Sequence, residues 1–147
     1  MYVQYMPTLN IVKHFKKNAY YHVYNRGAGK QDIFFDNKDY WTFHRICRNL
    51  AKKHKVKITA FSLLENHYHL MCFQSDEKKI TSFMRTAMTK YVIYINKKYN
   101  RSGRLFETIY KAIYMEDEDQ LRRTTEYILK NPINAGYLNW PHVGTKI

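Results

Sequence analysis

Residues 57–74 read KITAFSLLENHYHLMCFQ, and this stretch decides the fold. It holds two runs of aliphatic, β-branched and aromatic residues, Lys57–Leu64 and His67–Gln74, separated only by Glu65 and Asn66. Two such runs joined by so short a turn favour a pair of neighbouring strands. We therefore expect a strand over each run.

The histidines at the start of the second run carry the first chemical signal. Side chains at i and i+2 in a strand lie on the same face, so His67 and His69 lie together while Tyr68, Leu70 and Cys72 face the other way. Two imidazoles side by side can bind one cation, although an ordinary pair of strand histidines is the alternative. A closed structural zinc site is disfavoured because neither cysteine is placed to complete it. An open site, completed by substrate oxygens and water, fits two histidines better.

Working outward, alternating and helical patterns predict the other elements. These are a strand over Asn18–Asn25, a helix capped by Asp36 or Asn37 and containing Leu50, a helix over Ile80–Lys98, a strand over Leu105–Met115, and a helix that begins near Glu116–Asp119 and ends at Pro132. The order β-α-β-β-α-β with a trailing helix is typical of the ferredoxin-like split βαβ fold. We expect an α+β sandwich with a four-stranded antiparallel sheet, helices on one face and a C-terminal helix. The other face is expected to be free for a ligand or partner.

Length and charge set the class of protein. The 147 residues suit one domain over 1–147, and 25 Lys and Arg against 12 Asp and Glu give a formal charge of +13. Nucleic acid is the first partner this predicts, and an anionic membrane surface the second. No apolar run is long enough to span a bilayer and Met1–Asn10 does not resemble a signal peptide, so we expect a cytoplasmic protein. Cys47 and Cys72 are expected to be buried free thiols.

Helix geometry distinguishes one of the 14 tyrosines. In the third predicted helix Tyr127 lies roughly 100° from the apolar stripe. Its flank also carries Gln120, Arg123 and Asn131, which are one or two turns away. This gives the Tyr127 phenol a polar, partly basic environment. The alternative is a boundary tyrosine whose hydroxyl reaches solvent.

Together these residues resemble the single-tyrosine transposases of the HUH nuclease superfamily, which are small enzymes of certain insertion sequences and their relatives associated with repeated extragenic palindromes (REP). The resemblance runs from about residue 19 to residue 137, the core of the domain. It rests on four blocks in the family order: YHVYNRG at 21–27, NHYHL at 66–70, YNRSGRLF at 99–106, and YILKNP at 127–132 followed by NAG at 134–136. Two departures are Glu65, where proline is usual, and residues 107–110, which replace a more basic stretch.

The resemblance implies a reaction and a site. His67 and His69 would bind a divalent ion, Mg²⁺ or Mn²⁺, with Asn131 as third ligand. Tyr127 would attack a phosphodiester of single-stranded DNA, giving a covalent 5′-phosphotyrosine and a free 3′-hydroxyl that can later rejoin strands. Hairpin DNA would be the recognised partner. The resemblance leaves both a homodimer and a monomer open.

Basic residues near the sheet are expected to hold the DNA. The candidates are Arg26, Arg101, Arg104, Lys111 and Arg123. Contacts of this kind bind phosphates and carry little sequence information.

Two other functions compete with this interpretation. A non-catalytic ferredoxin-like module would bind single-stranded nucleic acid by stacking bases on Tyr20, Tyr21, Tyr24 and Tyr68. A metal-dependent hydrolase would need a carboxylate base, for which Glu65 is the nearest candidate. A covalent protein–DNA adduct separates the transposase from both.

Overall fold

The computed structural model describes residues 15–134, 136, 141–145 and 147. The predictions at Met1–Asn10 and the end of the resemblance at residue 137 lie outside them. Along the chain the elements are β1 (Ala19–Arg26), the 3-10 helix η2 (Ala28–Lys30), α1 (Asn37–His54), β2 (Val56–Leu64), β3 (His67–Gln74), α2 (Lys79–Lys98), β4 (Lys111–Tyr114), α3 (Glu118–Asn134) and β5 (Val143–Gly144).

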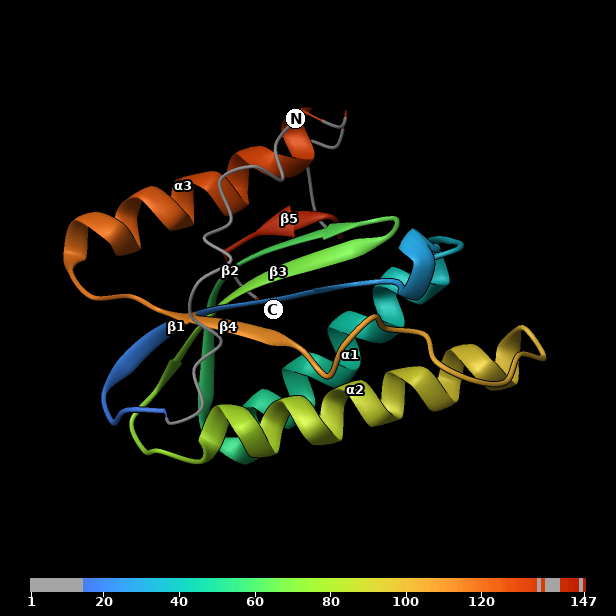
Figure 1. Cartoon of the computed structure of the whole chain (residues 1–147), viewed down its shortest axis with the longest axis horizontal. Coiled ribbons are helices and arrows are strands. Elements are labelled where there is room, and N and C mark those ends of the chain that lie inside the picture. The colour runs from blue at the N-terminus through green and yellow to red at the C-terminus, as the bar shows by residue number, and fades with distance from the viewer. Residues whose placement is uncertain (1–14, 135, 137–140, 146) are drawn as a thin grey trace.

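The strands form one antiparallel sheet in the order β4-β1-β3-β2-β5. The first four strands have the expected ferredoxin-like arrangement, and the two-residue β5 adds a fifth strand at the β2 edge. α1 and α2 cover one face, and α3 crosses the opposite face (Figure 1). The face that we expected to be free is therefore partly covered by the helix that carries Tyr127.

Alternation along β3 divides the interior into two clusters. Tyr68, Leu70 and Cys72 are buried in the larger cluster with the apolar faces of α1 and α2. Met71 belongs to the smaller cluster on the other face, where Ile128 of α3 packs. The predicted division of the strand into two faces is therefore confirmed.

The turn between β2 and β3 is tied to its surroundings. The backbone N–H groups of Ile33 and Phe34 both donate to the carbonyl of Glu65, at 2.7 and 3.1 Å. The N–H of Gly27 donates to the carbonyl of Asn66 at 2.9 Å. Two loops thus fix the turn from which β3 and its histidines start.

The fourth strand is shorter than predicted, because residues 105–110 do not join the sheet as a regular ladder. The side-chain amide of Asn25 donates to the carbonyls of Thr108 and Ile109, at 2.9 and 3.1 Å. These carbonyls would otherwise be available to a neighbouring strand. A single bridge between Gly27 and Phe106 is the remaining strand-like contact in this segment.

The third helix begins as predicted and ends later. Asp117 accepts from the N–H of Gln120 at 2.7 Å, and the Gln120 side chain accepts from the N–H of Glu116 at 2.8 Å. The prediction that Pro132 ends the helix was wrong, because α3 continues to Asn134 with Pro132 inside. A proline removes one backbone donor, a loss that the last turn of this helix accommodates.

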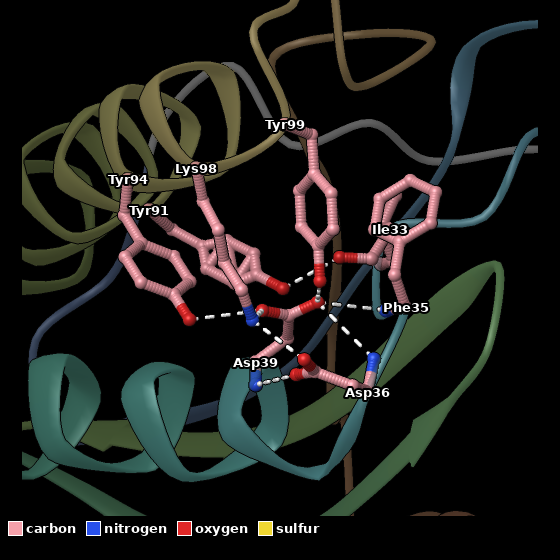
Figure 2. A network of polar contacts seen from close by, with 8 residues as sticks. All are labelled: Ile33, Phe35, Asp36, Asp39, Tyr91, Tyr94, Lys98 and Tyr99. Atoms are coloured by element: carbon pink, nitrogen blue, oxygen red, sulfur yellow. Dashed lines mark hydrogen bonds and ion pairs between the residues drawn. The ribbon is translucent and has the colours of Figure 1, made fainter.

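A buried carboxylate joins the start of α1 to the end of α2. Asp39 accepts hydrogen bonds from the Tyr94 and Tyr99 hydroxyls at 2.9 and 2.7 Å and from Lys98 Nζ at 2.8 Å (Figure 2). It also forms a capping box with Asp36 at the helix N-terminus. The helical layer is thereby fixed at the start of α1 by polar contacts as well as by its core.

Two further expectations concern the protein's class. Cys47 and Cys72 are both free and buried, as predicted. Within the described residues, no helix combines the length and apolar character that crossing a bilayer requires.

Candidate active site

The site is built on the two central strands. β1 pairs with β3 so that Tyr24 lies opposite His69 and Arg26 opposite His67. Because paired residues share a face, β1 places its alternate residues His22, Tyr24 and Arg26 on the histidine face of β3. This face lies beneath α3 (Figure 1).

His69 is the centre of the cluster. It is 1% exposed, and its Nδ1 lies 2.9 Å from Nε2 of His22, which is also buried. The two rings are nearly stacked, with centroids 5.1 Å apart. Nε2 of His69 is buried and has no hydrogen-bond partner among the described residues. An unpartnered buried nitrogen is costly unless a ligand completes it, and a neutral imidazole nitrogen is a common metal ligand.

His67, at the edge of the cluster, also has one ring nitrogen engaged in a hydrogen bond. Its Nδ1 lies 2.7 Å from Oδ1 of Asn66. An amide oxygen can only accept, so Nδ1 carries the proton and Nε2 keeps its lone pair. This is the arrangement by which a second hydrogen bond usually orients a metal-binding histidine.

The three histidines are held neutral. Burial lowers the pKa of His22 to about 3, and burial together with the Arg26 charge lowers the pKa of His67 to about 4. The pKa of His69 is lowered well below its usual value by burial and by the two neighbouring histidines. Neutral imidazoles are the form that binds cations, so at pH 7 these side chains would not have to lose a proton to bind one.

Tyr127 reaches the same cluster from α3. Its ring meets His69 edge-on with centroids 5.7 Å apart, and the ring of His22 is 6.4 Å away. Burial raises the pKa of Tyr127. Tyr24 stacks on His69 at 6.0 Å, and its pKa is raised by burial and by Tyr127. The tyrosine singled out by helix geometry therefore lies beside the histidines of its own chain.

Asn131 remains on α3, one turn after Tyr127 and half-buried. Asn131 keeps its place on the helix although a proline follows it, since α3 continues past both residues. Within the described part of the chain, no three His, Cys, Asp or Glu side chains are grouped to hold a metal ion.

The predicted DNA-binding residues divide into two groups. Arg26 forms an ion pair with Glu107 at 2.5 Å. Arg101 donates hydrogen bonds to the side chains of Asn96 and Gln31. Arg104 donates to the backbone carbonyls of Phe106 and Glu107. These three arginines therefore hold the loop around residues 96–107 as well as carrying charge.

Lys111 and Arg123 form the second group. Lys111 Nζ lies 5.9 Å from the ring centroid of Tyr24, next to the cluster. Arg123 is exposed on α3. The DNA contacts of all five basic residues stay predictions.

His22 was missed by the sequence reasoning. Its signal was present, because alternation along residues 21–26 places positions 22, 24 and 26 on one face. What the sequence lacked was the register that sets β1 beside β3.

The alternative of a binding module that stacks bases on tyrosines fits this arrangement poorly, since Tyr21 and Tyr68 are fully buried in the core.

Comparison with known proteins shows the family to which the chain is related. Residues 15–131, most of the chain, match the family described as IS200-like transposases. The chain belongs to the IS200-like transposase family. No curated protein matches the sequence of this transposase-family chain.

Two solved structures share the transposase-family chain's fold. A REP-associated tyrosine transposase bound to a REP hairpin aligns over 94% of this chain and 82% of its own length, with 14% identity and a TM-score of 0.70. A candidate transposase from Deinococcus radiodurans R1 aligns over 82% and 95%, with 13% identity and a TM-score of 0.55. At these identities the likeness extends to the fold alone.

Proposed function

We propose that this transposase-family protein is a metal-dependent enzyme that cleaves and rejoins single-stranded DNA through a covalent bond to Tyr127. The observation that carries the proposal is the unpartnered Nε2 of His69, whose ring meets the Tyr127 ring edge-on. A nucleophile, an incomplete ligand set and a basic chain then converge on one sheet face.

His67, His69 and Asn131 would hold the ion, for which Mg²⁺ or Mn²⁺ is proposed. When bound, the ion would offset charge on the phosphoryl oxygens. His22 acts through His69: if Nδ1–H of His69 donates to His22, the ring is fixed and Nε2 keeps its lone pair. The donor set fits such an ion because both histidines are neutral and each has a second hydrogen bond.

Tyr127 performs the displacement. Its hydroxyl oxygen forms a bond to the scissile phosphorus while the bond from phosphorus to the 3′ oxygen breaks. The phenol proton leaves, and the 3′ oxygen takes up a proton to become a free hydroxyl. Because burial raises the pKa of Tyr127, the phenol enters the reaction protonated and must lose its proton as the bond forms.

The partner proposed for this chain is single-stranded DNA with a hairpin. The net charge of +13 supports it, and so does the solved relative that is bound to a REP hairpin. Lys111 and Arg26 lie beside the cluster, where a strand on its way to Tyr127 would pass.

An adduct assay with two matched tyrosine variants tests the proposal. Hairpin DNA with a single-stranded flank, labelled at its 3′ end so that the label stays on the fragment bound to tyrosine, is incubated with protein and Mn²⁺ and then run on a denaturing gel. Wild type and Tyr24→Phe are expected to give a labelled protein band, and Tyr127→Phe to give none. An adduct in Tyr127→Phe that is absent in Tyr24→Phe would move the nucleophile to Tyr24, and an adduct in neither would contradict the mechanism.

A further inference from the structure

The positive charge lies mainly away from the tyrosine. α3 carries three basic and three acidic residues, so its formal charge is balanced. α2 has no acidic residue, and the one acid of α1 is the buried Asp39. Together α1 and α2 carry ten lysines and arginines: Lys38, Arg45, Arg48, Lys52, Lys53, Lys79, Arg85, Lys90, Lys97 and Lys98. The most cationic layer thus lies across the sheet from α3 (Figure 1).

A groove opens in this layer along α1. It has a volume of about 830 Å³, and its lining includes Lys38, Trp41, Arg45 and Arg48. The spacing of these residues places them on one exposed stripe of the helix. Trp41 is 56% exposed, which is unusual for so large an apolar side chain. No Asp or Glu side chain lines the groove among the described residues.

Ion pairing divides the cations of the groove into two kinds. Lys98, at the rim, is ion-paired with Asp36 and Asp39. Lys38, Arg45 and Arg48 form no ion pair within the part of the chain that the structure describes. Their charge is therefore available to a ligand.

We infer that this groove binds an unpaired nucleotide of the DNA, outside the segment that is cleaved. The base stacks on Trp41, and its flanking phosphates contact Arg45 and Arg48, with Lys38 at the end of the stripe. The volume lies within the roughly 300–1,000 Å³ typical of sites for small ligands. The inference rests on the proposed function for the identity of the substrate as DNA, but it concerns binding and not chemistry.

An exposed indole beside two guanidinium groups favours nucleic acid over the other anionic partners. An acidic peptide or an anionic membrane would use the charges, but neither presents a flat ring to Trp41. Loss of stacking and loss of charge can therefore be measured separately.

The test uses a fluorescein-labelled oligothymidylate of about 20 nucleotides and an abasic strand of the same length. Trp41→Ala is expected to weaken binding of the oligothymidylate about tenfold, with Trp41→Phe close to wild type. Neither change is expected to affect binding of the abasic strand, which has phosphates but no bases. Equal binding of the oligothymidylate by Trp41→Ala and wild type would overturn the inference.

Charge is tested with Arg45→Gln/Arg48→Gln against Lys52→Gln/Lys53→Gln. The second pair removes the same charge from the same helix outside the groove. Arg45→Gln/Arg48→Gln is expected to weaken binding of both strands at least fivefold more than the lysine pair does. It is also expected to reduce the slope of log affinity against log salt concentration by about 1.4, for two lost phosphate contacts. Equal effects of the two pairs would indicate that DNA responds to the overall positive charge of the helix, and would overturn the inference of a specific binding groove.

The same variants separate this inference from the proposed function. All of them are expected to form the Tyr127 adduct with a short strand that covers only the cleavage site. If wild type forms no adduct while the groove variants still lose affinity, the proposed function fails and the groove stands. If the adduct forms and affinity is unchanged in every groove variant, the groove fails alone.

Discussion

Two buried polar clusters of this protein differ in whether they are complete. The Asp39 cluster between α1 and α2 supplies its carboxylate with donors from Tyr94, Lys98 and Tyr99 and from the backbone (Figure 2). The His69 cluster leaves Nε2 without a partner. Buried polar groups are nearly always paired, so a complete cluster indicates a structural role and an incomplete one indicates where a ligand belongs.

The two clusters also treat charge in opposite ways. Burial lowers the pKa of Lys98, but its hydrogen bonds with Asp36 and Asp39 outweigh this effect and raise it above its usual value. The pKa values of His22 and His67 are lowered to about 3 and about 4, chiefly by burial. One cluster stabilises an ion pair, and the other excludes protons and leaves room for a different cation.

The largest difference is expected when the histidines are removed. His67→Ala/His69→Ala should lower metal-dependent nicking by at least about 100-fold, because phosphoryl oxygens lose their counter-charge. The free energy of unfolding should also fall, by about 2 kcal/mol, because the buried His69 ring leaves a cavity and His22 loses its partner, so nicking is compared for the folded fraction. Nicking rates and urea unfolding check this, and unchanged nicking with its ion dependence intact would place the metal elsewhere.

Removing the carboxylate of the complete cluster should have the converse effect. Asp39→Ala should lower the free energy of unfolding by about 3–5 kcal/mol, because Lys98 loses its buried partner and two tyrosine hydroxyls lose their acceptor. Adduct formation by the folded fraction should stay at the wild-type level. Urea unfolding gives the first quantity, and a loss under about 1 kcal/mol would show that water replaces the carboxylate.

A smaller effect is expected from the residue behind His69. His22→Ala should weaken Co²⁺ binding by about 10–100-fold, as loss of an orienting partner does elsewhere. His22→Gln, whose amide oxygen can accept from Nδ1 of His69, should recover part of it. The visible absorption of bound Co²⁺ reports the ligand field directly. Identical spectra and affinities in wild type and His22→Ala would exclude a positioning role.

The last effect, spread over several pH units, concerns the dependence of stability on pH. In the unfolded chain His22 and His67 bind protons near pH 6.5, whereas in the native state they do so only at about pH 3 and pH 4. The stability that comes from keeping these two histidines neutral is fully present above about pH 6.5. It is lost as the pH falls from there to about 3–4, by about 1.4 kcal/mol per pH unit for each proton that the native state excludes. His22→Gln should flatten the decline by about one proton. Unfolding at several pH values checks this, and equal slopes would contradict the assignment.

Local patterns predicted most of what a single segment determines. Alternation placed His67 and His69 on one face, helical spacing singled out Tyr127, and the acidic run marked the start of α3. The resemblance and the order of elements led to the fold and to the family. Each of these depends on residues close together in the chain.

The features that were missed depend on contacts between distant segments. His22 meets His69 only through the register of β1 on β3. Asn25 shortens β4 from 83 residues away. The bonds of Arg101 to Gln31 and Asn96 were not predicted either. Side-chain contacts of this range are set by tertiary packing, to which periodicity is insensitive.

The tied turn at residues 65–66 has an entropic consequence. Its two carbonyls accept from Gly27, Ile33 and Phe34, so the chain on either side is ordered before any substrate arrives. Ordering a residue costs about 1–2 kcal/mol, and here that cost falls on folding instead of on substrate binding. The proposed metal ligands at the start of β3 therefore belong to a rigid part of the chain, and on the proposed function the entropy lost on association would come mainly from the DNA strand.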